Sequence, residues 1–276
     1  MIVKADTHLH TLFSTDSDTP VEAQINRAIE LGLSEICITD HMDHGFPVDQ
    51  CPGYGENPFL LDVDAYLHKL NEIKDTSDIC VNIGIECGLQ TDADIVELNK
   101  ELLSSHPFDQ VIGSIHLIDK KDPYYPAFWE GRDTTDTLKR YFEITYDNLI
   151  AFDGIDILGH LDYAVRYLPQ EAVYDPKEYF ELTDEILKLM IKRDIALEIN
   201  TASLKKGYGV TNPHPDIIKR YYGLGGRMIT LGSDAHTPDG MAFGFEKCAD
   251  ELINIGFSEY LTFKNRKPVA HTLKGR

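Results

Sequence analysis

Short apolar runs rich in β-branched residues alternate along this chain with longer segments in which apolar residues recur at helical spacing. The short runs predict seven strands: Ile2–His8, Glu35–Asp40, Cys80–Glu86, Gln110–His116, Ile155–His160, Ile195–Asn200 and Met228–Asp234. The longer segments predict helices near Pro20–Leu31, Val63–Lys74, Ala93–Ser104, Thr135–Ala151, Pro176–Lys192, Pro215–Tyr222 and Met241–Ile255.

The repeated alternation of strand and helix favours the α/β class with a parallel sheet. Closing that sheet into a (β/α) barrel leaves no strand edge exposed, so we expect a barrel, with an open doubly wound sheet as the alternative. No linker rich in Pro, Gly or Ser divides the sequence, and residues 1–276 are expected to form one domain. Asp43–Asp62 and Asp119–Asp133 lack periodicity and predict long loops that can cover a site.

Composition narrows the class of protein. The 276 residues carry 46 acidic and 26 basic side chains, a formal net charge of −20, which argues against a partner that is a nucleic-acid polymer. No apolar stretch reaches membrane-spanning length and the N-terminus lacks a secretory signal, so we expect a cytoplasmic protein without membrane contact. A monomer is compatible with this size and charge. The five cysteines form no CxxC pair.

Most predicted strands end in a side chain that can bind a divalent metal. His8 and His10 are two residues apart on one strand and therefore project from the same face. Later strand ends carry Asp40 with His41, Glu86, His116, His160, and Asp234 with His236. In a parallel barrel all carboxyl ends face one rim, so these side chains are expected to converge there. Asp16, in the loop after His10, adds another carboxylate.

Imidazole and carboxylate ligands without a thiolate suit Zn, Mn or Fe and argue against a closed, cysteine-based structural zinc site. The ligands outnumber what one tetrahedral ion can use, so we expect two to three divalent metal ions. Such ions activate water and neutralise the charge of a developing oxyanion, as the hydrolysis of a phosphate ester requires.

Six motifs, in this order and spacing, resemble the polymerase and histidinol phosphatase (PHP) superfamily: Asp6–His10, Ile38–His41, Gly84–Glu86, Gly113–His116, Gly159–Asp162 and Gly232–His236. The resemblance implies a distorted (β/α)7 barrel that binds three divalent ions. The chain length, the Gly113–His116 motif and the Phe128–Gly131 segment look most like the members that hydrolyse histidinol phosphate in histidine biosynthesis.

The resemblance also implies a ligand set for each ion. His8, His10, Glu86 and Asp234 resemble the set around the first ion. Glu86, His116 and His160 resemble the second set, with Glu86 as the bridge. Asp16, His41 and His236 resemble the third.

The mechanism we hypothesise is attack of a metal-bridging hydroxide on phosphorus, with Asp234 or His41 delivering a proton to the leaving alkoxide. Arg166, six residues after His160, is the first candidate to bind the phosphate. The weaker candidates are Arg132, Ser203 and Lys205, and any of the four can instead make an ordinary loop salt bridge or hydrogen bond. Four loop aromatics can either face the substrate or pack the loop down, and packing is favoured: Tyr124, Tyr125, Phe128 and Trp129.

Two other functions stay open at this point. A PHP-family phosphoesterase acting on a nucleotide or oligonucleotide would use the same ligands, although the acidic charge disfavours a polymer substrate. A non-catalytic partner domain is the alternative outside enzymes. Such a domain would be expected to have lost ligands, and this chain keeps every expected ligand type.

Overall fold

A computed structural model describes residues 2–50, 55 and 58–273 of the chain. Parts of the predicted Asp43–Asp62 loop, including Cys51, lie outside the described residues. The main sheet is parallel, with the strand order β1-β2-β4-β5-β6-β7-β8. The strands are β1 (Ala5–Leu9), β2 (Glu35–Ile38), β4 (Cys80–Gly88), β5 (Gln110–Ser114), β6 (Ile157–Leu158), β7 (Ala196–Asn200) and β8 (Ile229–Gly232), and a short β3 (His41–Met42) pairs with β4.

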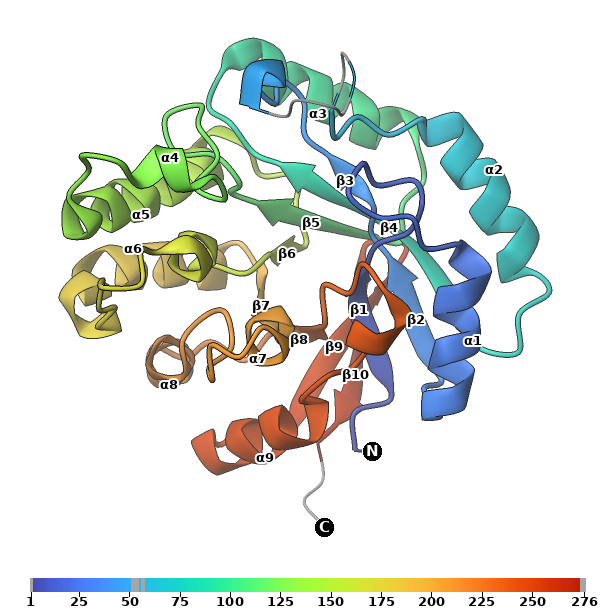
Figure 1. The fold of residues 1–276 in the computed structure, drawn as a ribbon. Helices are drawn as coiled ribbons and strands as arrows, with labels where there is room; N and C mark the ends of the chain where they lie inside the picture. Colours follow the sequence, from blue (N-terminus) through green and yellow to red (C-terminus); the bar gives the residue numbers. More distant parts are fainter. Residues whose placement is uncertain (1, 51–54, 56–57, 274–276) are drawn as a thin grey trace.

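The first and last strands of this path meet and close the barrel. Just beyond β8, the N–H of Asp234 donates to the carbonyl of His8 at 2.9 Å. One step further, the N–H of His10 donates to the carbonyl of Ala235 at 3.1 Å. The predicted seven-stranded α/β barrel is therefore confirmed, and Figure 1 shows its helices arranged outside the strands.

The barrel is distorted most at β6, which is shorter than the predicted Ile155–His160. The N–H of Gly159 still donates to the carbonyl of Gly113. The N–H of His160, however, donates to Oε2 of Glu198 at 2.7 Å, so a side chain takes the place of a ladder partner. The chain therefore leaves the sheet where a site residue begins.

The seven predicted helices are present, two of them with later starts, and two short helices, Pro126–Trp129 and Ala202–Lys205, were not predicted. They are α1 (Val21–Leu31), α2 (Val63–Lys74), α3 (Ala93–Ser105), α4 (Pro126–Trp129), α5 (Thr134–Ala151), α6 (Phe180–Lys192), α7 (Ala202–Lys205), α8 (Pro215–Gly223) and α9 (Phe245–Ile255). Pro176–Tyr179 forms a separate 3₁₀ turn before α6. The predicted helix from Met241 begins only at Phe245, because Ala242 has a positive φ of 52° and its N–H is bound by Asp6.

An antiparallel hairpin that the sequence analysis did not predict follows α9. It consists of β9 (Glu259–Lys264) and β10 (Lys267–Thr272). Asn265 and Arg266 form its turn, with φ values of 49° and 62°. This turn reaches the amino ends of β5 and β6, where Asn265 N–H donates to Asp109 and Arg266 binds Asp156. The hairpin therefore supports the end of the barrel opposite the strand carboxyl ends.

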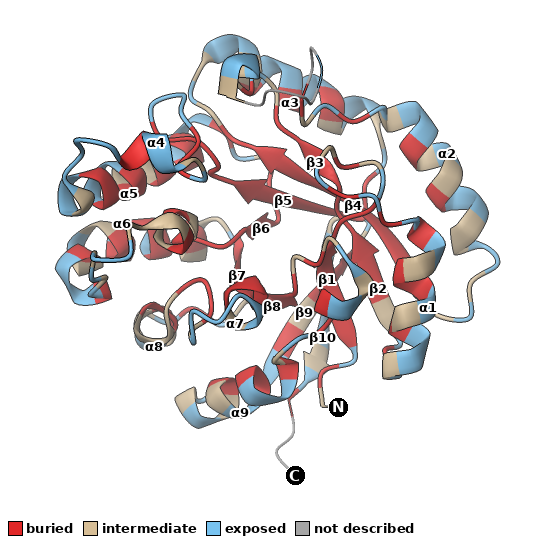
Figure 2. Cartoon of the chain, viewed as in Figure 1, coloured by how far each residue is buried: buried red, intermediate tan, exposed pale blue. Residues whose placement is uncertain are grey.

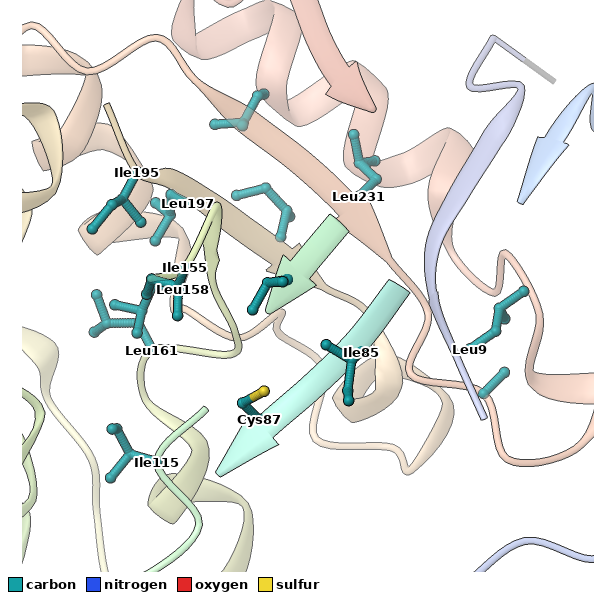
Figure 3. Packing of buried hydrophobic residues seen from close by; sticks show 14 of the residues in the cluster. Leu9, Ile85, Cys87, Ile115, Ile155, Leu158, Leu161, Ile195, Leu197 and Leu231 are labelled. Carbon is teal, nitrogen blue, oxygen red and sulfur yellow. The ribbon is translucent and has the colours of Figure 1, made fainter. Parts of the chain in front are cut away.

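The apolar core lies between the strands and the surrounding helices. Strand side chains such as Leu9, Ile85 and Leu197 pack in this core (Figure 3). Figure 2 shows that the strands of the parallel sheet are mostly buried, whereas the helices carry buried residues on one side and exposed residues on the other. No described helix combines the length and the apolarity that crossing a bilayer requires.

Candidate metal centre

The predicted ligands meet at the carboxyl ends of the strands. They come from β1 and the loop after it, from β3, from β4, and from the residues that directly follow β5, β6 and β8. These side chains are His8, His10, Asp16, His41, Glu86, His116, His160, Asp234 and His236. The chain segments that carry them span 229 positions, from residue 8 to residue 236, and the barrel brings them to one rim.

Glu86 stands at the centre of this group, fully buried on β4. Its Oε2 lies 3.2 Å from Nε2 of His8, 3.4 Å from Nε2 of His10 and 3.0 Å from Nδ1 of His41. Its Oε1 lies 3.3 Å from Nε2 of His116 and 3.0 Å from Nε2 of His160. One carboxylate thus faces five imidazoles.

Asp234 and Asp16 extend the group toward His236. Oδ1 of Asp234 lies 3.4 Å from Nε2 of His10 and 3.7 Å from Nδ1 of His236. Oδ2 of Asp16 lies 3.1 Å from Nε2 of His236 and 3.8 Å from Nε2 of His41. The ring of His10 stacks on that of His236, with 4.1 Å between the centroids.

Three overlapping triplets have donor atoms that all lie within 4.8 Å of one another: His10/His41/His236, His8/His10/Glu86 and His41/Glu86/His116. Several of these buried atoms, Glu86 Oε2, His41 Nδ1 and His236 Nε2 among them, lie close to other ligand atoms, but none of them makes a hydrogen bond of suitable geometry in the described part of the chain. Buried polar atoms are normally satisfied, so orphans gathered in one place indicate a ligand. Neutral imidazoles and carboxylates at this spacing fit divalent metal ions.

A second layer of acceptors orients the imidazoles from behind. Oε1 of Glu198, on β7, lies 2.5 Å from Nδ1 of His8. Oδ2 of Asp43 lies 2.9 Å from Nδ1 of His116. The hydroxyl of Ser14 lies 3.0 Å from Nδ1 of His10 and donates to Asp40 at 2.6 Å. Such partners fix which ring nitrogen faces a metal.

Asp40, expected among the strand-end ligands, has its carboxylate behind the cluster, where it binds Thr11 and Ser14. Neither Asp43 nor Ser14 was predicted to belong to the site. Glu198 had a visible signal, because it alternates with Asn200 on one strand face and so points to the same rim.

The pKa values show how strongly these charges interact. Burial lowers the pKa of His10 to about 3, helped by His236 and His41. Burial acts in the same direction on His41, but the carboxylates of Glu86 and Asp16 overcome it and raise the pKa of His41 to about 9. Burial would raise the pKa of Glu86, yet the surrounding histidines hold it well below its ordinary value. The carboxylate of Glu86 is therefore ionised.

The cluster opens into a cleft of about 750 Å³ that is also lined by Arg166 and Lys205. Arg166 is buried, and its Nη1 donates to Oδ2 of Asp234 at 2.9 Å. Its Nη2 donates to Oδ1 of Asn200 at 2.7 Å, and its Nε to Oδ1 of Asn212 at 2.8 Å. Three hydrogen bonds to three residues hold the guanidinium in one orientation at the edge of the cleft.

The other phosphate-binding candidates lie differently. Nζ of Lys205 pairs with Asp239 at 2.7 Å while the residue lines the cleft. Ser203 is buried and donates to Oδ1 of Asn212, behind Arg166. Arg132 is exposed, lies over the ring of Phe128 at 4.3 Å and is not among the residues that line the cleft. The structure thus brings Arg166 and Lys205 to the cleft, but not Arg132.

A profile of the PHP domain family matches residues 6–202. The chain belongs to the PHP domain family. It is similar to the probable histidinol-phosphatase of Clostridium acetobutylicum, with 36% identity over 87% of this chain and 89% of that protein. It is also similar to the histidinol-phosphatase of Lactococcus lactis, with 31% identity over 96% of each.

Solved structures agree with this membership. The crystal structure of the Lactococcus lactis histidinol phosphate phosphatase, complexed with zinc, L-histidinol and phosphate, superposes with a TM-score of 0.86 at 30% identity. That alignment covers 96% of this chain and 98% of the other. The PHP membership inferred from the motifs is therefore confirmed.

Proposed function

We propose that this PHP-domain protein is a metal-dependent phosphomonoester hydrolase that converts histidinol phosphate to histidinol and phosphate. The observation that carries the proposal is a buried cluster of imidazoles and carboxylates that opens, beside a fixed guanidinium, into a cleft sized for a small molecule. The similarity to histidinol-phosphatases extends over 96% of this chain, which supports histidinol phosphate as the substrate.

The residues that would hold the ions are the nine rim ligands, in two or three sites for Zn, Mn or Fe: His8, His10, Asp16, His41, Glu86, His116, His160, Asp234 and His236. When bound, such ions lower the pKa of water and neutralise phosphoryl oxygens. Zinc is the metal in the complexed Lactococcus lactis structure.

The chain's own groups would bind the ester and move the proton. Arg166 would bind phosphoryl oxygens with the N–H groups that its three protein partners leave free, and Lys205, which also lines the cleft, is a second candidate. Asp234 and His41 are the candidates to protonate the leaving alkoxide. Protonating Asp234 would weaken its ion pair with Arg166, and His41 would have to give up a proton while its ring serves as a metal ligand, so both stay candidates.

The test is a substrate comparison with protein purified without chelator. We expect turnover of histidinol phosphate to exceed that of nucleotide monophosphates and short oligonucleotides by at least about 100-fold in kcat/KM, and elemental analysis to find two or three ions per chain. A preference for a nucleotide would favour the alternative phosphoesterase. No turnover of any ester by metal-loaded protein would favour the non-catalytic alternative.

A further inference from the structure

The loop between β5 and α4 brings one acidic residue, Asp122, to the cleft. Ile118 and Lys121 exchange backbone hydrogen bonds of 2.8 and 3.0 Å, and Asp119 and Lys120 between them have φ values of 47° and 63°. Positive φ at both central residues is the geometry of a type I′ turn, which reverses the chain. Asp122 therefore returns toward the rim a few residues after the ligand His116.

The loop is held in place by its own packing. The indole N–H of Trp129 donates to the carbonyl of Pro123 at 2.8 Å, and both Phe128 and Trp129 are buried. The N–H of Asp122 donates to Oε1 of Gln50 at 2.8 Å. The predicted packing role thus holds for Phe128 and Trp129, and it leaves Asp122 at a fixed position on the cleft wall.

Asp122 differs from the other acids that line the cleft. Asp16, Asp43 and Asp234 each lie within ion-pair distance of a histidine or an arginine. Asp122 is only 7% exposed, and its Oδ1 accepts the N–H of Tyr124 at 2.8 Å. No cationic side chain among the described residues pairs with it. Burial raises its pKa to about 6, so it remains ionised at neutral pH.

Aromatic rings continue from Asp122 to the metal cluster. Tyr124 is 57% exposed and lines the cleft, and its ring meets that of Tyr167 at 5.4 Å. Tyr167 meets Tyr163 at 5.1 Å, and Tyr163 meets the ligand His116 at 5.2 Å. Tyrosine faces attract organic cations. The cleft thus has rim ligands and Arg166 in one part, and Asp122 with tyrosine rings in another, where Nζ of Lys206 lies 5.8 Å from the ring centroid of Tyr167.

We propose that Asp122, with Tyr124 and Tyr167, binds the cationic organic end of the substrate and so determines specificity. This inference rests on the proposed function. Histidinol phosphate carries an ammonium and an imidazole on the same small skeleton as its phosphate. The metal cluster attracts the phosphate and repels the ammonium, and Asp122 supplies the complementary negative charge.

The test compares the wild type, Asp122→Asn and Asp119→Asn on histidinol phosphate and on p-nitrophenyl phosphate, whose organic group is neutral. For Asp122→Asn we expect the ratio of the two kcat/KM values to fall by about tenfold or more, mainly through a higher KM for histidinol phosphate. Asp119→Asn is the matched control. Its carboxylate is exposed and pairs with Arg140, and asparagine tolerates its positive φ, so the ratio should be retained.

Product inhibition distinguishes the loss of a specific binding contact at Asp122 from a general disruption of the loop. With p-nitrophenyl phosphate as substrate, Asp122→Asn should raise the inhibition constant of L-histidinol about tenfold and leave that of inorganic phosphate at its wild-type value. Equal weakening of both inhibitors, or a retained ratio in the ester comparison, would overturn the assignment while the proposed function stands. A wild type that does not turn over histidinol phosphate would overturn the proposed function itself, and the subsite with it.

Discussion

The two ends of this barrel both bury carboxylates but satisfy them differently. At the amino end, Asp109 accepts N–H groups from Ile83 and Asn265, each at 3.1 Å, and lies 2.9 Å from Nζ of Lys74. Asp156, at the start of β6, accepts the N–H of Val111 at 2.8 Å and binds Arg266. Each carboxylate there has both a backbone donor and a cation from the chain itself.

At the carboxyl rim the chain supplies few cations. Glu86 faces five imidazoles, and its Oε2 lacks a hydrogen-bond partner within the described residues. Arg166 neutralises only one oxygen of Asp234. Buried carboxylates that are paired with cations of the same chain support the fold. Buried carboxylates without such partners require a bound ligand to compensate their charge. The amino end should therefore govern stability, and the rim should govern metal binding and turnover.

Glu86→Gln tests the rim most severely. The substitution removes the charge that all five imidazoles share, so we expect kcat/KM for histidinol phosphate to fall on the order of 10³-fold or more, together with the bound metal. Steady-state kinetics and elemental analysis measure both effects. Retention of activity within tenfold of the wild type would refute the central position given to Glu86.

Asp109→Asn tests the opposite end. Loss of this charge leaves Lys74 and two backbone donors poorly matched, so we expect the free energy of unfolding to fall by about 3 kcal/mol. The value of kcat/KM, measured well below the melting temperature, should stay within about twofold of the wild type, since Asp109 lies far from the rim in the barrel. If Asp109→Asn kept its stability but lost activity, the assignment of stability to the amino end and of turnover to the rim would be wrong.

The stability difference between the wild type and Asp109→Asn is expected to depend on pH. Burial opposes ionisation, but Lys74 and the backbone donors lower the pKa of Asp109 below its ordinary value of 3.8. A carboxyl group with a lowered pKa stabilises the fold fully above its ordinary value and loses this contribution as the pH falls through the folded-state pKa. The stability difference between wild type and Asp109→Asn should therefore narrow below about pH 4 in denaturant titrations.

Metal removal is expected to have a smaller effect on stability. Ions that bind only the folded chain stabilise it by about 2.7 kcal/mol at a free concentration of 100 Kd. Thermal melts with a chelator and with added zinc or manganese should show this difference in both the wild type and Asp109→Asn. Identical melting temperatures with and without metal would mean that the rim binds no ion.

Glu198→Gln has the mildest expected effect. The carboxylate accepts from the backbone N–H of His160 and from Nδ2 of Asn200 while it also orients His8, and an amide cannot serve all three. We expect metal affinity to fall by about 10- to 100-fold, measured by competition with a chromogenic chelator. The exposed Glu185→Gln is the control, and an equal loss there would remove the case for Glu198.

The gathering of candidate metal ligands at the carboxyl rim of the barrel could be predicted from the sequence. Candidate ligands such as His8 and Glu86 end β-branched runs, and strand direction alone brings such ends together. The hairpin of β9 and β10 at the amino end of the barrel was not predicted. Its turn is formed by Asn265 and Arg266, which adopt positive φ values although neither is a glycine. The sequence does not reveal that Arg132 lies over the ring of Phe128, because this contact depends on how the loop packs. Local pattern indicates where a strand ends, but not how a loop folds back.

The seam between β1 and β8 has a consequence for biosynthesis. His8 and His10 leave the ribosome well before Asp234 and His236, which complete their surroundings. The barrel cannot close on a nascent chain before both partners of the seam exist. A metal site that uses His10 together with Asp234 can therefore be completed only after both segments have been synthesised.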